Sequence, residues 1–249
     1  MSGHSKWSTI KRKKGAADAK RGKVFTKLIR EIATAARLGG PDIDSNPRLR
    51  LSCEKARGAN MPKDNIARAI AKGIGAGEGE SYEEIVYEGY GPGGVAVYIE
   101  ALTDNKNRTA GDVRHVLTKH GGNLGASGCV SYLFEKRGVM RFDRSAVDAD
   151  ELLEAALDAA ADDVVEADDG LEVVVGPARF EALKRALAAA GFEPELAEIQ
   201  MEPTTTVSVH GADAESMLSL IDALEDLDDV QHVYANFDVS DQEMARIAG

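Results

Sequence analysis

The segment Gly73-Ile74-Gly75-Ala76-Gly77-Glu78-Gly79 divides the sequence into two parts with different patterns. Its four glycines have no side chain to pack into a core and few restrictions on φ, so we predict a flexible linker and a domain boundary here. The segment is not predicted to bind phosphate, because it follows a helical pattern rather than a strand and lacks a Gly-Lys-Ser/Thr ending.

Three helices are predicted before the linker. From Asp18 to Leu38 apolar residues recur at spacings of three and four, which is typical of one buried helix face. Gly39-Gly40-Pro41 ends this helix. Asn46 and Pro47 are suited to cap and begin a second helix that runs to Arg57, and Pro62 begins a third that runs to Lys72.

After the linker the pattern changes to strands. Ile85–Tyr90 and Val95–Leu102 are predicted strands on either side of a turn at Gly91-Pro92-Gly93-Gly94. A helix over Asn107–His120 and a strand near Val130–Phe134 are expected to follow.

The next segment contains six predicted elements in the order βαββαβ. They are Val139–Phe142, Asp150–Ala160, Val164–Ala167, Leu171–Val175, Pro177–Ala190 and Glu195–Gln200, with the hairpin turning at Asp168-Asp169-Gly170. This order is that of the ferredoxin-like unit and is complete in itself. The tail that follows is predicted to form a strand, a helix and a strand, which is too little to fold alone. These are Thr206–Val209, Ala214–Leu227 and Val230–Asn236.

These elements predict an α+β protein. An N-terminal three-helix domain, residues 1–78, is followed by two α/β domains. One is split between residues 79–135 and 203–249, and the other, the ferredoxin-like domain of residues 136–202, is inserted in it. The split follows from pairing the short tail with the ββαβ segment before residue 136, because each is incomplete without the other.

Charge is distributed unevenly along the chain. Residues 1–75, the basic head, contain 18 Lys and Arg against 6 Asp and Glu, whereas residues 76–249, the acidic body, contain 12 against 36. A basic segment of this kind indicates a polyanion partner, because cations that neutralise phosphates release condensed counterions. The sequence leaves one alternative open, in which the basic head docks on the acidic body of the same chain.

The first predicted helix carries a row of cations opposite its apolar face. The row consists of Lys20, Lys23, Lys27, Arg30 and Arg37. Its first four members are called the basic ridge below, and an ordinary solvated face is the alternative explanation. We expect the ridge to contact phosphates, with cations of the third helix extending the patch. The candidate nucleic-acid-binding residues are Lys6, Trp7, Lys11, Arg12, Lys13, Lys14, Lys20, Arg21, Lys23, Lys27, Arg30, Lys63 and Arg68.

Trp7 is the only tryptophan and lies among these cations. An exposed indole in such a setting can stack on an unpaired base, as aromatic side chains do in single-strand and RNA recognition. It could equally pin the N-terminal segment to the core. The sequence does not decide between the two roles.

Other classes of function have little support. The chain contains no HExxH or GxSxG motif, and its acidic pairs, such as Asp228-Asp229, fall in predicted loops where turns and solvated surface explain them. Cys53 and Cys129 are too few for a zinc site. We therefore expect no catalysis, cofactor, metal or small-molecule substrate. The absence of a long apolar run or a signal peptide predicts a cytoplasmic protein without a membrane partner, expected as a monomer.

Many stretches of the chain resemble the YebC family. They include Gly3-His4-Ser5-Lys6-Trp7, Arg21-Gly22-Lys23-Val24-Phe25-Thr26-Lys27-Leu28, Asn60-Met61-Pro62-Lys63-Asp64-Asn65-Ile66, Tyr87-Glu88-Gly89-Tyr90-Gly91-Pro92-Gly93-Gly94 and His120-Gly121-Gly122-Asn123-Leu124-Gly125. The resemblance implies a helical N-terminal domain, two α/β domains and a non-enzymatic cytoplasmic regulator. The family is classed with DNA-binding transcriptional regulators, and it includes a mitochondrial translational activator of a cytochrome oxidase subunit.

Three functional hypotheses follow. The first is a DNA-binding transcriptional regulator, which the family's classification favours. The second is a translation factor that binds ribosomal RNA and transfer RNA at the ribosome, which Trp7 and the absence of a helix-turn-helix pattern favour. The third is an enzyme with a site that the motifs do not reveal, and a small molecule that stabilises the protein would indicate it.

Overall fold

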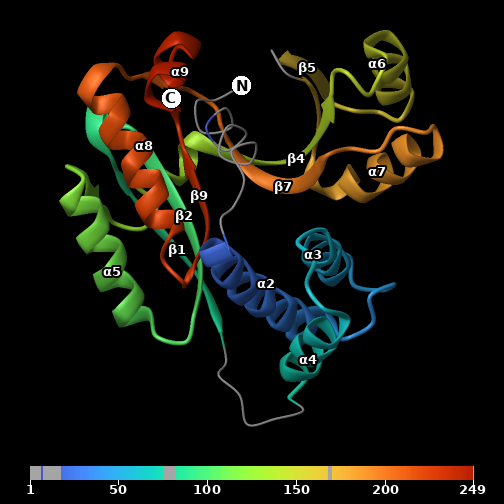
Figure 1. Ribbon diagram of the computed structural model, residues 1–249, viewed down its shortest axis with the longest axis horizontal. Coiled ribbons are helices and arrows are strands. Elements are labelled where there is room, and N and C mark those ends of the chain that lie inside the picture. The colour runs from blue at the N-terminus through green and yellow to red at the C-terminus, as the bar shows by residue number, and fades with distance from the viewer. Residues whose placement is uncertain (1–6, 8–17, 76–81, 168–169, 249) are drawn as a thin grey trace. The chain divides into compact units, whose positions relative to one another are not determined.

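The computed structural model describes residues 7, 18–75, 82–167 and 170–248 of the chain (Figure 1). The predicted cations Lys6 and Lys11–Lys14 lie outside the described residues, as do residues 76–79 of the predicted linker and Asp168-Asp169 of the predicted hairpin turn. The chain forms two compact units. One lies within Phe134–Thr204, and the other combines the chain before Phe134 with the chain from Thr205 onward.

The helical part of the larger unit has the three predicted helices. They are α2 (Asp18–Gly39), α3 (Pro47–Gly58) and α4 (Lys63–Gly73), each within one residue of the prediction. The apolar stripe of α2 packs on the other two helices, and Ile32, Leu49 and Cys53 are fully buried between them. The predicted α+β class with an N-terminal helical region is therefore confirmed.

Asn46 holds the turn between α2 and α3. Its side chain is buried, accepts a hydrogen bond from the Leu49 amide at 3.0 Å, and donates to the Ala35 and Gly40 carbonyls at 2.9 Å each. One carboxamide therefore caps the start of α3 and satisfies the end of α2, which explains the Asn-Pro sequence at this position.

Asn46→Ala is expected to lower the free energy of unfolding by about 2 kcal/mol, because it removes an N-cap and two further hydrogen bonds to main-chain carbonyls at the end of α2. Urea denaturation followed by circular dichroism measures this change. Ser45→Ala is the control, since its hydroxyl makes only a long, exposed hydrogen bond of 3.4 Å to Asp42. Equal losses in the two variants would contradict the role given to Asn46.

The α/β part of the larger unit is built on a four-stranded antiparallel sheet of order β3-β1-β2-β9. The strands are β1 (Glu83–Tyr90), β2 (Ala96–Thr103), β3 (Asn123–Leu124) and β9 (Val230–Ala235). Helices α5 (Lys106–Lys119) and α8 (Gly211–Glu225) lie against one face of it (Figure 1). Val113, Leu117, Met217 and Ile221 of these helices are fully buried on Ile99 and its neighbours.

The C-terminal tail has more structure than the sequence indicated. β8 (Val207–Ser208) does not join the main sheet but pairs in parallel with β10 (Phe237–Asp238), and a final helix, α9 (Asp241–Ala248), was not predicted. The strand predicted at Thr206–Val209 is present as β8, whereas β10 and α9 are too short for hydrophobic periodicity to identify them.

The smaller unit is a sheet of order β5-β6-β4-β7 with all neighbours antiparallel, flanked by two helices. Its elements are β4 (Phe134–Asp143), α6 (Ala149–Asp158), β5 (Asp163–Ala167), β6 (Gly170–Val175), α7 (Phe180–Ala189) and β7 (Leu196–Pro203). This is the expected βαββαβ order. α7 packs so closely on β4 that a Cβ at Gly138 would lie 2.4 Å from the ring of Phe180.

The predicted strand at Val130–Phe134 is wrong. Ser131–Leu133 is a short 3-10 turn, and a single longer strand, β4, begins at Phe134 and includes the predicted strand Val139–Phe142. The reason lies in Glu88, whose carboxylate accepts hydrogen bonds from the amides of Val130 and Ser131 at 2.8 Å each. These two amides are therefore not available to donate hydrogen bonds to a neighbouring strand.

Candidate nucleic-acid interface

The basic ridge of α2 contacts the C-terminal end of α8. Lys23 donates a hydrogen bond to the main-chain carbonyl of Asp226 at 3.1 Å and lies 3.8 Å from its carboxylate. One turn further along α2, Lys27 donates to the carbonyl of Glu225 at 2.5 Å. The side chains of Lys20 and Arg21, at the start of the helix, lie outside the part of the chain that the structure describes.

The sequence of α8 explains why cations gather at its end. The last carbonyls of a helix lack intrahelical donors and carry the negative end of its dipole, so Lys and Arg are stabilised there. From Gly211 to Asp229 the chain has seven acidic residues and no Lys or Arg. Docking of the basic head on the acidic body, the alternative that the charge pattern left open, is thus the arrangement found for Lys23 and Lys27.

Arg30 makes the most buried contact of the ridge. Its guanidinium donates to the Asp229 carboxylate at 2.6 Å and to the Asp228 carbonyl at 2.7 Å, and both side chains of the Arg30–Asp229 pair are largely inaccessible to solvent. The other donors to the Asp229 carboxylate are Thr103, Arg108 and Thr109. Burial alone would raise the pKa of Asp229, but these hydrogen bonds, led by that of Arg108, hold its pKa below the ordinary value.

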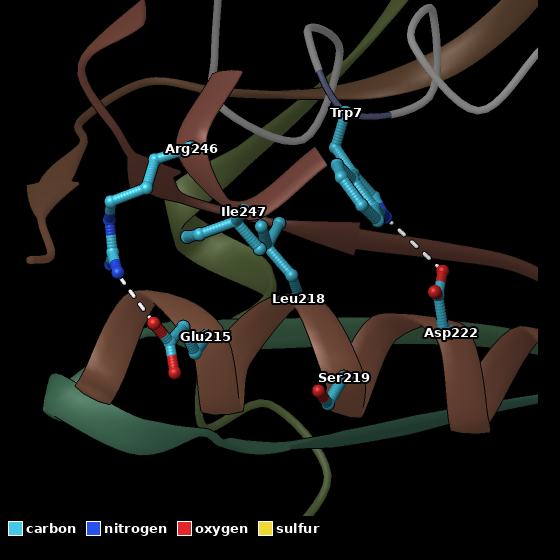
Figure 2. A pocket seen from close by; sticks show the side chains of 7 residues that line it. All are labelled: Trp7, Glu215, Leu218, Ser219, Asp222, Arg246 and Ile247. Atoms are coloured by element: carbon cyan, nitrogen blue, oxygen red, sulfur yellow. Dashed lines mark hydrogen bonds and ion pairs between the residues drawn. The ribbon is translucent and has the colours of Figure 1, made fainter. Parts of the chain in front are cut away.

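Trp7 lines a pocket of about 460 Å³ together with residues of α8 and α9 (Figure 2). The indole points at α8, where its N–H donates to Asp222 at 3.1 Å, and its ring packs at the edge of the α/β core. Leu218 of α8 and Ile247 of α9 also line the pocket, as do Glu215 and Arg246, which form an ion pair at 2.9 Å. In this structure Trp7 is therefore hydrogen-bonded to α8, and its stacking on a base stays a prediction.

Three further cations of the head, on α3 and α4, have different surroundings. Arg48 is held by the carboxylates of Glu31 and Glu84, which raise its pKa although burial opposes this, so it serves the fold. Lys63 and Arg68 are exposed on α4. Arg68 donates a hydrogen bond to the side chain of Asn65, on the same helix, at 2.5 Å. The structure thus brings Lys23, Lys27 and Arg30 together, whereas Lys63 and Arg68 lie on another helix.

Sequence analysis missed the acidic partner of the ridge. Asp228-Asp229 was assigned to a solvated loop, yet Asp229 is 6% exposed and receives four side-chain donors. The available signal was the long run without Lys or Arg in residues 211–229. Tyr82 was also missed, and its ring lies 5.2 Å from both the Arg30 guanidinium and the Lys72 ammonium, as in cation–π contacts.

The hypothesis of an enzyme depends on the side chains found in the described ranges. Within them no three His, Cys, Asp or Glu side chains come together as metal ligands. Burial raises the pKa of the Cys53 and Cys129 thiols, which makes both less nucleophilic at neutral pH. None of the described helices is both long and apolar enough to cross a membrane.

Comparisons with known proteins agree over nearly the whole chain. The family model described as "TACO1/YebC protein N-terminal domain" matches residues 5–76, and that described as "TACO1/YebC second and third domain" matches residues 82–237. A protein of Citrifermentans bemidjiense named "Probable transcriptional regulatory protein" is 60% identical over 99% of this chain and 100% of its own length. A relative of the same description in Geobacter sulfurreducens is 59% identical with the same coverage. The crystal structure of a conserved hypothetical protein from Aquifex aeolicus matches with a TM-score of 0.83 and 51% identity, covering 90% of this chain and 93% of that one.

Proposed function

Because the chain belongs to the TACO1/YebC family and its close relatives are named as transcriptional regulatory proteins, we propose that it is a DNA-binding regulator of transcription that acts without catalysis. The observation that carries the proposal is the concentration of positive charge in residues 1–75 of an otherwise strongly acidic chain. Such a distribution suits a head that binds phosphates and a body that is repelled by them.

The contacts of the head would be made with the DNA backbone rather than with base edges. The segment between α2 and α3, residues 40–46, is longer than the turn of three to four residues in a helix-turn-helix motif. Lysines of the ridge can neutralise phosphates in any sequence, so they supply affinity and position the protein without specifying a site. Sequence preference would then come from DNA shape or from a partner protein.

Replacing Lys23 and Lys27 together by alanine should weaken DNA binding equally across sequences. It should also flatten the plot of log affinity against log salt by about 1.8, since each phosphate contact on duplex DNA contributes about 0.9 to the slope. Fluorescence anisotropy with a labelled duplex at several salt concentrations measures both effects.

Lys119→Ala with Lys136→Ala is the matched control for this experiment. These two lysines are exposed on α5 and β4, and their removal changes the net charge of the chain by the same amount. An unchanged slope in the Lys23/Lys27 variant, or an equal change in the control, would remove the ridge from the binding surface.

A translation factor that binds ribosomal and transfer RNA is the second candidate. The observation that favours it is the absence of a helix-turn-helix arrangement from α2 and α3, because phosphate contact without base reading suits structured RNA as well as duplex DNA. Binding that depends on ribosomes and shows no preference for duplex DNA would support this candidate over the first.

A further inference from the structure

The acidic C-terminal end of α8 contacts two separate parts of the predicted nucleic-acid surface, Trp7 and the basic ridge. Asp222 in the last turns of α8 accepts the indole N–H of Trp7, and the end of the same helix accepts hydrogen bonds from Lys23 and Lys27. The carboxylate and the carbonyl oxygens accept hydrogen bonds from these donors, as the negatively charged oxygens of a phosphate backbone would. The residues Asp222–Asp229 are called the acidic clasp below.

The contacts of the clasp differ in burial, and this decides which of them can open. Lys23 and Asp226 keep 47% and 60% of their side chains exposed, and exposed ion pairs of this kind are weak and screened by salt. In the Arg30–Asp229 pair the corresponding exposures are 14% and 8%. Breaking that pair would leave the largely buried Arg30 guanidinium without a carboxylate, so the pair holds while the outer contacts open.

We propose that the acidic clasp is an intramolecular competitor of nucleic acid, which occupies Trp7, Lys23 and Lys27 in the free protein and is displaced by the phosphate backbone on binding. The proposal rests on the proposed function, because the same residues contact the clasp in a closed state and nucleic acid in an open state. α2 pivots about Arg30, and the outer end of the ridge exchanges the carbonyls of α8 for phosphates.

The closed state affects affinity and selectivity. When only a fraction of the molecules is open, the apparent dissociation constant is the intrinsic constant divided by that fraction. A ligand that offers one phosphate cannot replace all the clasp contacts at once, whereas a continuous backbone can. The clasp therefore favours long polyanions over nucleotides and free phosphate.

Weakening the clasp should strengthen binding. In the double variant Asp222→Asn with Asp226→Asn, the affinity for a labelled duplex is expected to rise roughly threefold to tenfold, because both clasp contacts lose their charge while Lys23 keeps its hydrogen bond to the main chain. The emission of Trp7, the only tryptophan, should change in the free variant because its indole N–H loses its charged acceptor at Asp222. The single variant Asp226→Asn also tests whether weakening the clasp raises affinity. It carries little risk to folding, because the Asp226 side chain is 60% exposed.

The control must separate release of the clasp from lower repulsion of the polyanion. Glu154→Gln with Asp158→Asn removes the same charge from the exposed surface of α6, in the smaller unit. If this control gains as much affinity as the clasp variants, or if the clasp variants gain none while the wild type binds, the competitor role is overturned.

A zero-length crosslink tests displacement itself. A carbodiimide joins an amine to a carboxylate in contact, and Lys23 and Asp226 meet this requirement at 3.8 Å. Mass spectrometry of the free protein should find the Lys23–Asp226 amide, and saturation with a duplex of about 20 base pairs should suppress it. A crosslink that persists at full saturation overturns the proposal while leaving nucleic-acid binding intact. Binding by neither wild type nor clasp variants overturns the proposed function as well.

Discussion

Replacing Asp229 by asparagine is expected to lower the free energy of unfolding by about 3–5 kcal/mol, the cost of removing one partner from a buried ion pair. The Asp229 carboxylate is 6% exposed and neutralises Arg30, which is itself nearly buried. It also accepts from Arg108 at 2.8 Å and from the Thr109 hydroxyl at 2.7 Å. An amide of the same shape would leave the Arg30 guanidinium without a counter-charge and Arg108 with Asp104 alone, and it would turn one acceptor into a donor. Urea denaturation of the full chain measures the loss.

Asp228→Asn is the matched control, because its side chain is exposed and only its main-chain carbonyl accepts from Arg30. We expect a change within about 0.5 kcal/mol for this neighbour. A similar effect at the two positions would show that Asp229 acts through general charge rather than as the hub of a buried network.

The lowered pKa of Asp229 gives this prediction a dependence on pH. Hydrogen bonds from Arg108, Thr109 and Arg30 outweigh burial and hold the folded-state pKa below that of the unfolded chain. The unfolded state therefore binds the proton more tightly. The contribution of Asp229 to stability is complete above the unfolded pKa of about 4 and is lost as pH falls through the folded value. The difference in stability between wild type and Asp229→Asn should shrink over this acid range.

The second large effect is expected at Glu88, where Glu88→Gln should lower the free energy of unfolding by about 3 kcal/mol. The buried carboxylate accepts three main-chain hydrogen bonds, from Gly128 at 2.7 Å and from Val130 and Ser131 at 2.8 Å each. Burial raises its pKa, but these amides outweigh that effect and lower it. A glutamine would oppose at least one amide with its own N–H₂ group, and the loop that leads into β4 would lose its fixed conformation.

Glu83→Gln, on the same strand, provides the comparison. Its pair with Lys106 at 2.7 Å is more than half exposed on both sides, so its removal should cost less than about 1 kcal/mol. Hydrogen exchange of the Val130 and Ser131 amides would add a local readout, since Glu88→Gln should release these protons first. Unchanged protection there would contradict the role of Glu88 even if the variant were unstable.

The helices were predictable because they obey local rules. The apolar spacing of α2 and the Asn46-Pro47 cap of α3 depend on residues close in sequence. The same holds for Asn105, which caps α5 by accepting from the Arg108 amide at 3.1 Å. The prediction of a strand at Val130–Phe134 was wrong because amides of this segment donate to the Glu88 carboxylate instead. Glu88 precedes Val130 by 42 residues, so no local sequence pattern indicates this contact.

The predicted site shows the same limit. Charge segregation indicated a basic ridge and also its alternative, docking on the acidic body, but only the fold places Lys23 and Asp226 together, 203 residues apart. Trp7 was assigned two roles with equal weight, and its hydrogen bond to Asp222 spans 215 residues. Contacts of this separation depend on how the strands pair and how helices pack on them, so their partners cannot be read from spacing along the chain.

Crosslinking in living cells, with sequencing of both the DNA and the RNA recovered with the protein, tests the central claim most directly. The account predicts discrete peaks at promoters for the wild type, weaker peaks for Lys23→Ala with Lys27→Ala, and stronger ones for Asp222→Asn with Asp226→Asn. Recovery dominated by ribosomal and transfer RNA, with no promoter enrichment, would contradict transcriptional regulation and establish the translation factor in its place. Recovery of neither nucleic acid above background would contradict the account as a whole.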